Sequence, residues 1–128
     1  MKKRIFITAT NTDIGKTHTT KLLLKEFAAR GIRVGVIKPI ETGVIDGIAP
    51  DGEELLECVK ELNNTFKALR VEDIVPVVYA LAAAPFVASN NTPLDLKKID
   101  LAIEKLEKLC DVLIIEGAGG LYVPIDAK

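Results

Sequence analysis

The chain has 128 residues, a formal net charge of −1 and 27% charged residues. This length suits one domain with a useful core, and the balanced charge favours neither a nucleic-acid-binding face nor a polybasic membrane patch. No apolar stretch is long enough to span a bilayer, and polar residues from Thr8 to Asp13 interrupt the first apolar run too early for an export signal. We therefore expect a cytoplasmic protein with no nucleic-acid or membrane partner.

Short apolar runs alternate with helical patterns along the chain. The strand-like segments are Arg4–Thr8, Val34–Ile37, a short extended segment at Val75–Leu81, and Val112–Ile115. The helical segments are Lys16–Arg30, Glu53–Asn63, a short helix from Pro85 to near Asn90, and Leu96–Cys110. Gly31 is placed to end the first helix and Pro39 to stop the second strand. This alternation predicts an α/β fold, a doubly wound parallel sheet with helices on both faces.

Apolar residues at helical spacing predict which helix faces pack on that sheet. They are Leu22, Leu23, Phe27 and Ala28 in the first helix, Leu55, Leu56, Val59 and Leu62 in the second, and Ile99, Ala102, Ile103, Leu106 and Cys110 in the last. Cys58 and Cys110 are isolated within such patterns. We expect buried core cysteines, with a disulfide or metal site as the less favoured interpretation.

The segment Ala9-Thr10-Asn11-Thr12-Asp13-Ile14-Gly15-Lys16-Thr17 lies between the first strand and the first helix. A Gly-Lys-Thr helix start after a strand and a polar loop predicts a phosphate-binding loop (P-loop), in which backbone N–H groups and the helix N-terminus attract phosphate. Lys16 would reach the β/γ-phosphates and the Thr17 hydroxyl would ligate Mg²⁺. His18 is interpreted as a first-turn helix residue near nucleotide and not as a base. The alternative is a polar turn with an accidental lysine.

Three further polar segments follow predicted strands or precede a helix. They are Lys38-Pro39-Ile40-Glu41-Thr42-Gly43, Asp51 just before the second helix, and Glu116-Gly117-Ala118-Gly119-Gly120. Open α/β sheets bind ligands beyond the carboxyl ends of their strands, so we expect these segments beside the phosphate loop. Separately, Lys38 could be a solvated charge, Asp51 a helix N-cap, and Glu116-Gly117 a turn.

Taken together in this order, the motifs resemble those of the dethiobiotin synthetase family along the whole chain. The family's loop, Gly-Thr-Asp-Thr-x-Val-Gly-Lys-Thr, has the same extra residue relative to the usual P-loop, and here Ala9 and Asn11 replace its first Gly and its Asp. Its Lys-Pro segment matches Lys38-Pro39, its following Ser matches Thr42, its metal-ligand Asp matches Asp51, and its Glu-Gly-Ala-Gly-Gly motif is intact from Glu116.

This resemblance implies an ATP- and Mg²⁺-dependent enzyme that captures CO₂ on 7,8-diaminopelargonate and closes the ureido ring of dethiobiotin. The reaction would pass through a carbamate and a carbamic–phosphoric mixed anhydride. The catalytic residues implied are Lys38 and Lys16, and the metal ligands are Thr17, Asp51 and Glu116. Thr12, Lys38 and Thr42 would bind substrate. The nucleotide would contact Thr12, Asp13, Ile14, Gly15, Lys16, Thr17, His18, Asp51, Glu116, Gly117, Ala118 and Gly119.

Two alternative functions remain open from the sequence. One is a related ATP-dependent amide-forming or ligase-like P-loop domain, and the other is a regulatory P-loop ATPase or GTPase switch. The family also continues beyond the Glu-Gly-Ala-Gly-Gly loop and forms homodimers. We therefore expect residues 1–128 to be a single P-loop α/β domain truncated at its C-terminal end, and a homodimer when full length.

Overall fold

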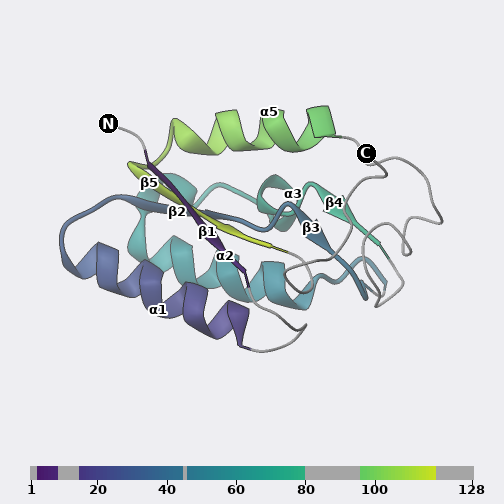
Figure 1. Ribbon diagram of the computed structural model, residues 1–128, viewed down its shortest axis with the longest axis horizontal. Helices are drawn as coiled ribbons and strands as arrows, with labels where there is room; N and C mark the ends of the chain where they lie inside the picture. The colour runs from purple at the N-terminus through teal and green to yellow at the C-terminus, as the bar shows by residue number, and fades with distance from the viewer. Residues whose placement is uncertain (1–2, 9–14, 45, 80–95, 118–128) are drawn as a thin grey trace.

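Helices cover both faces of a parallel sheet in the computed structural model, which describes residues 3–8, 15–44, 46–79 and 96–117 (Figure 1). Helices α1 (Lys16–Ala29) and α2 (Pro50–Leu62) lie on one face, and α5 (Leu96–Glu107) lies on the other. The predicted α/β fold is confirmed. None of the helices among the described residues combines the length and apolar character needed to cross a membrane.

Among the described residues, the main sheet has three strands in the order β1-β5-β2, all parallel. Its strands are β1 (Lys3–Ile7), β2 (Val34–Ile37) and β5 (Val112–Glu116). The central strand β5 is buried along its whole length, as its continuous apolar sequence requires. Ile7 pairs with Glu116, and Ile37 pairs with Ile115. The carboxyl ends of all three strands therefore meet at one edge of the sheet.

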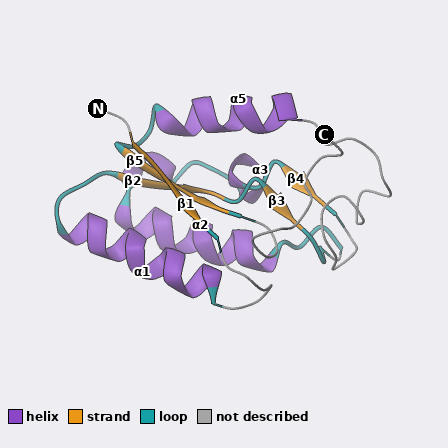
Figure 2. Ribbon diagram, in the orientation of Figure 1, coloured by secondary structure: helices purple, strands orange, loops and turns teal. Residues whose placement is uncertain are grey.

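A second, two-stranded parallel sheet extends from that edge (Figure 2). Pro39 ends β2 as predicted, but the chain resumes at once as β3 (Ile40–Glu41), which pairs with β4 (Val77–Val78). The predicted extended segment Val75–Leu81 contains β4, and its last two residues lie outside the described part. The 3₁₀ helix η1 (Asn64–Phe66) and the short helix α3 (Val71–Ile74) were not predicted, because such short elements lack a periodic signal.

The helix boundaries differ from the predictions by a few residues. Helix α2 begins at Pro50 and not at Glu53, because proline at the first helical position needs no hydrogen-bond partner for its nitrogen. Asp51 consequently lies inside the first turn and does not precede the helix. Helix α5 ends at Glu107, earlier than the predicted Cys110. The predicted helix from Pro85 to Asn90 lies outside the described residues.

The apolar core lies between the sheet and its helices. The predicted faces of α2 and α5 are confirmed, since Leu55, Val59 and Leu106 are fully buried. In α1 the prediction was wrong at one position: Leu24 is fully buried, whereas Leu22 is 53% exposed. Three consecutive leucines leave the helix register open in the sequence, and packing against the sheet decides it.

Both cysteines lie in this core, which confirms their predicted burial. No disulfide joins Cys58 and Cys110. Burial raises the pKa of the Cys58 thiol, which keeps it neutral at ordinary pH.

Candidate functional site

Glu116 is the centre of a buried polar cluster at the carboxyl edge of the sheet. Its side chain is only 1% exposed. Thr20 Oγ1 lies 2.9 Å from Glu116 Oε1, and the other oxygen, Oε2, accepts hydrogen bonds from Lys38 Nζ at 3.0 Å and Thr17 Oγ1 at 3.2 Å. A carboxylate this deeply buried requires such partners, because burying an unpaired charge is very costly.

The start of helix α1 contributes Lys16, Thr17 and Thr20 to this cluster. Gly15 is the N-cap residue and has φ 84°, a left-handed conformation that glycine adopts without steric cost. Lys16 is buried, and its ammonium group donates a hydrogen bond of 2.9 Å to the carbonyl oxygen of Gly117. The Gly-Lys-Thr sequence therefore lies directly beside the end of β5, as the phosphate-loop hypothesis predicted.

Lys38 joins two carboxylates from different elements. It directly follows β2, its backbone nitrogen donates to Ile74 O at 2.8 Å, and its side chain is 6% exposed. The Lys38 ammonium lies 3.0 Å from Glu116 Oε2 and 3.9 Å from Asp51 Oδ2. The structure thus brings together Lys16, Thr17, Lys38, Asp51 and Glu116, the predicted catalytic and metal-binding residues.

Gly117 connects the cluster to strand β1. Its nitrogen donates to Ile7 O at 2.9 Å, which continues the β1–β5 pairing by one residue. A Cβ atom at this position would lie 3.2 Å from the Phe6 ring and 3.4 Å from Ile7 O. Glycine therefore allows the backbone carbonyl that Lys16 contacts to approach β1 closely.

Two of the remaining predicted residues lie in the described part of the chain. Thr42 is half-buried just after β3, and His18 is exposed in the first turn of α1. The other predicted positions lie outside the described residues; they are Thr12, Asp13, Ile14, Ala118 and Gly119.

Sequence reasoning missed two residues of this site. Thr20 contacts Glu116, and its position three residues after Thr17 on the same helix face could have indicated it. Glu41 is buried at the end of β3 and accepts hydrogen bonds from Asp51 N at 3.0 Å and Gly52 N at 2.8 Å. Burial raises the pKa of the Glu41 carboxyl, and these two backbone hydrogen bonds oppose that shift.

The donor set fits a magnesium ion that is shared with a bound phosphate group. Among the described residues no three His, Cys, Asp or Glu side chains form a group that could hold a metal. Mg²⁺ does not need one, because it binds through one or two carboxylates together with substrate phosphates and water. Asp51 and Glu116 converge on the Lys38 ammonium, which shows that this point attracts positive charge.

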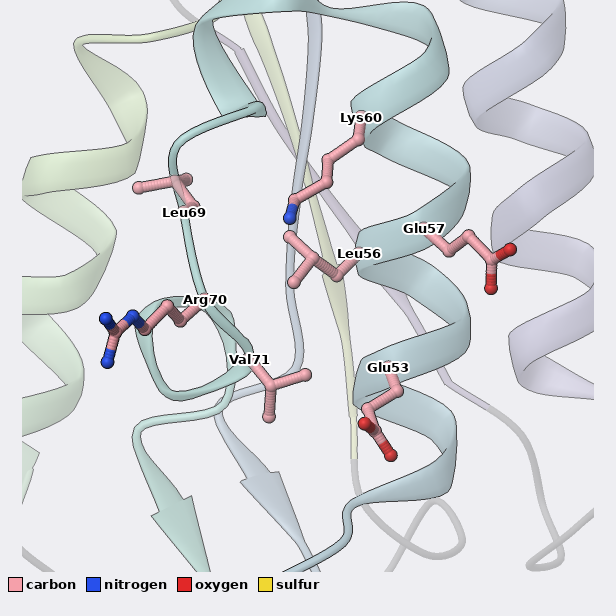
Figure 3. A pocket seen from close by; sticks show the side chains of 7 residues that line it. All are labelled: Glu53, Leu56, Glu57, Lys60, Leu69, Arg70 and Val71. Carbon is pink, nitrogen blue, oxygen red and sulfur yellow. The ribbon is translucent and has the colours of Figure 1, made fainter.

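A cavity of about 410 Å³ lies elsewhere, along one face of α2 (Figure 3). Its lining comes from α2, from the chain that follows η1 and from the first residue of α3: Glu53, Leu56, Glu57, Lys60, Leu69, Arg70 and Val71. None of the residues around Glu116 lines this cavity. We therefore place the functional site at the carboxyl edge of the sheet and not in this cavity.

The helix-covered parallel sheet and the Gly-Lys-Thr helix start define the class of protein, a P-loop α/β domain. The chain belongs to the family whose model is described as "AAA domain", which matches residues 3–128.

Three curated relatives of the chain carry the same name. The ATP-dependent dethiobiotin synthetase BioD of Sulfurovum sp. (strain NBC37-1) is 50% identical over 121 residues, which cover 94% of this chain and 57% of the relative. The protein of the same name from Thermodesulfovibrio yellowstonii is 38% identical, covering 100% of this chain and 53% of the relative. That from Helicobacter pylori (strain J99) is 38% identical, covering 94% and 57%. The resemblance seen in the motifs is confirmed, and the chain spans little more than half the length of these relatives.

Proposed function

We propose that this chain forms the nucleotide-phosphate and metal site of an ATP-dependent dethiobiotin synthetase. Its substrates would be ATP, CO₂ and 7,8-diaminopelargonate, and it would need Mg²⁺. The observation that carries the proposal is the convergence of Lys16, Thr17, Lys38 and Asp51 around the buried Glu116. The relatives' name supplies the reaction to which this arrangement is assigned.

Phosphoryl transfer requires positioned charge more than a nucleophilic side chain, and this cluster supplies positioned charge. Lys16 would turn from the Gly117 carbonyl to the β/γ-phosphates of ATP. Thr17, Asp51 and Glu116 would hold Mg²⁺ directly or through water, and the ion, when bound, would neutralise charge on the phosphate oxygens.

Lys38 is suited to the step that distinguishes this reaction. It would stabilise the anionic carbamate formed from one substrate amine and CO₂, and then the charge that moves onto the transferred phosphoryl group. A carbamate oxygen would attack the γ-phosphoryl group of ATP and release ADP, and the second amine would then attack the carbonyl carbon of the mixed anhydride, closing the ring and releasing phosphate. Thr12 and Thr42 would orient the diamine, and the loops at 13–18 and 117–119 would wrap the phosphates. We further propose that the protein acts as a cytoplasmic homodimer.

The decisive experiment is a coupled turnover assay of the full-length protein with diaminopelargonate and bicarbonate, using each nucleoside triphosphate in turn. We expect nucleotide cleavage and dethiobiotin formation that both depend on the diamine. A rate of nucleotide hydrolysis that does not depend on the diamine but rises when a protein or membrane is added would favour a regulatory switch. Turnover with a different amine or acid would favour a related amide-forming ligase.

Lys16→Ala provides the matched test of the phosphate site. It should cost on the order of several kcal/mol of transition-state stabilisation, because a preorganised cation facing the phosphates is lost. Lys25→Ala, at an exposed position on the same helix, should leave both nucleotide affinity and turnover unchanged. Equal behaviour of the two variants would refute the phosphate-site assignment.

A further inference from the structure

The first turn of helix α2 lacks a cap from its own sequence. The N-cap residue is Ala49, whose side chain makes no capping hydrogen bond, and the first intrahelical bond runs from Glu53 N to Ala49 O at 2.9 Å. Pro50 has no N–H group. Asp51 and Gly52, the second and third residues of the helix, therefore have N–H groups without a partner inside the helix.

Glu41 satisfies both of these groups from another element. Its carboxylate oxygens accept from Asp51 N at 3.0 Å and from Gly52 N at 2.8 Å, and Glu41 itself is 3% exposed. A carboxylate at a helix N-terminus also interacts favourably with the helix dipole. Glu41 thus ties the start of α2 to strand β3, three residues after Lys38.

Gly52 shows how close this contact is. A Cβ atom at that position would lie 2.4 Å from Val75 Cγ2 and 3.2 Å from Glu41 Oε1. A side chain at position 52 would therefore force either Val75 or the start of the helix to shift. The close approach lets the carboxylate reach the backbone, and it leaves Asp51 Oδ2 3.9 Å from the Lys38 ammonium.

We propose that Glu41 is a positioning residue that holds the Asp51 carboxylate at the metal site. It acts through the backbone of Asp51 and Gly52. This inference rests on the proposed function, in which Asp51 is a ligand of Mg²⁺. Residues that fix a ligand in this way typically change metal affinity by about 10–100-fold when they are substituted.

The test is a measurement of metal affinity, made on the full-length protein with Mn²⁺ as a spectroscopic substitute for Mg²⁺. Free Mn²⁺ is followed by electron paramagnetic resonance in the presence of a non-hydrolysable ATP analogue. Glu41→Gln should weaken Mn²⁺ binding about tenfold and raise the Mg²⁺ concentration that gives half-maximal turnover by the same factor. Glu41→Asp, which keeps the charge but shortens the reach, should act in the same direction. Affinity for the analogue without metal should stay unchanged.

Two comparisons separate positioning from a purely structural cap. Glu53→Gln makes the same chemical change at an exposed position of the same helix turn and should not alter Mn²⁺ affinity. In an Asp51→Asn background, Glu41→Gln should have no further effect on Mn²⁺ affinity, because its influence passes through Asp51.

Three results would overturn the proposal. In the first, Glu41→Gln lowers the melting temperature but leaves Mn²⁺ affinity unchanged. In the second, Glu41→Gln weakens Mn²⁺ binding by the same factor in the wild-type and Asp51→Asn backgrounds. If Asp51→Asn itself weakens Mn²⁺ binding, either of these results would refute the positioning role of Glu41 and leave the proposed function intact. If Asp51→Asn also left Mn²⁺ affinity unchanged, the metal role of Asp51 in the proposed function would fail, and this inference with it.

Discussion

The two ends of strand β5 carry ion pairs of similar length in opposite surroundings. At the carboxyl end, Lys38 Nζ and Glu116 Oε2 are 3.0 Å apart, and their side chains are 6% and 1% exposed. At the amino end, Arg33 Nη2 and Asp111 Oδ1 are 3.2 Å apart, with side chains 53% and 48% exposed. Water competes for the second pair and is excluded from the first.

Burial changes what each pair costs and contributes. An exposed pair is screened by solvent and contributes little to stability. A buried pair requires two charges to leave water, and its attraction often only repays that cost. Stability alone therefore gives no reason to keep Lys38 and Glu116 buried. The proposed role in holding phosphate and metal would give one, because electrostatic interactions are strongest where water is excluded.

Lys38→Ala should produce the largest effect. It leaves the Glu116 carboxylate buried without its cation, so we expect a loss of about 3–5 kcal/mol in the free energy of unfolding, measured by denaturant titration of the full-length protein. Turnover at saturating Mg-nucleotide should also fall much further than nucleotide affinity, measured by calorimetry. Lys38→Arg should not restore turnover fully, since a planar guanidinium cannot replace a compact ammonium. If Lys38→Ala left both stability and turnover unchanged, the buried pair would differ in no measurable way from the exposed pair at the other end of β5.

Removing the whole buried pair should cost much less stability than removing half of it. The double variant Lys38→Met/Glu116→Gln has no buried charge to leave unpaired, and the amide can still bond the hydroxyls of Thr17 and Thr20. We expect its free energy of unfolding to return to within about 1–2 kcal/mol of the wild-type value. Turnover should stay at least as low as in Lys38→Ala. A double variant less stable than Lys38→Ala would show that the pair itself stabilises the fold.

Much of this arrangement was predictable because it depends on local patterns and on sheet geometry. The apolar, β-branched sequence of β5 predicted a strand in a parallel sheet with helices on both faces, and the carboxyl ends of parallel strands meet at one edge. The strand order was not predicted; the pairing of β2 with β5 in the structure is what makes Lys38 and Glu116 neighbours.

The tertiary contacts that hold these residues in place could not be predicted from local patterns. Glu41 reaches the backbone of Asp51 only because β3 packs against the start of α2, and no local pattern encodes that contact. The predicted start of α2 was three residues too late, because Pro50 and Gly52 in its first turn are typical of a loop. Leu24 was overlooked for a related reason, because only tertiary packing selects one leucine among three.

The carboxylate of Asp73 is intermediate in exposure between the pairs at the two ends of β5, since its side chain is 26% exposed. The hydrogen bond from Arg70 N lowers the pKa of its carboxyl, and the ammonium of Lys105, 3.0 Å away, acts in the same direction. A lowered pKa in the folded state contributes stability above the ordinary carboxyl pKa, and this stability is lost as pH falls through the lowered value.

Asp73→Ala should therefore lower the free energy of unfolding by about 1 kcal/mol at neutral pH, the usual effect of losing a helix cap. The difference from wild type should shrink as pH falls below the ordinary carboxyl range. Denaturant titrations at a series of pH values check this. A difference that stays constant across the acid range would mean that the charge of Asp73 contributes nothing.

Arg33→Ala should have the smallest effect, and it is the matched control for Lys38→Ala at the other end of the sheet. The pair it breaks with Asp111 is solvated and screened by salt, and holding two long side chains in one geometry offsets much of their attraction. The backbone contacts stay, because Asp111 N and Val112 N donate to the Arg33 carbonyl at 2.8 Å and 3.2 Å. We expect no measurable change in the denaturation midpoint at low or high salt, and none in turnover. If Arg33→Ala destabilised the protein as much as Lys38→Ala, burial would not be what distinguishes the two ends of β5.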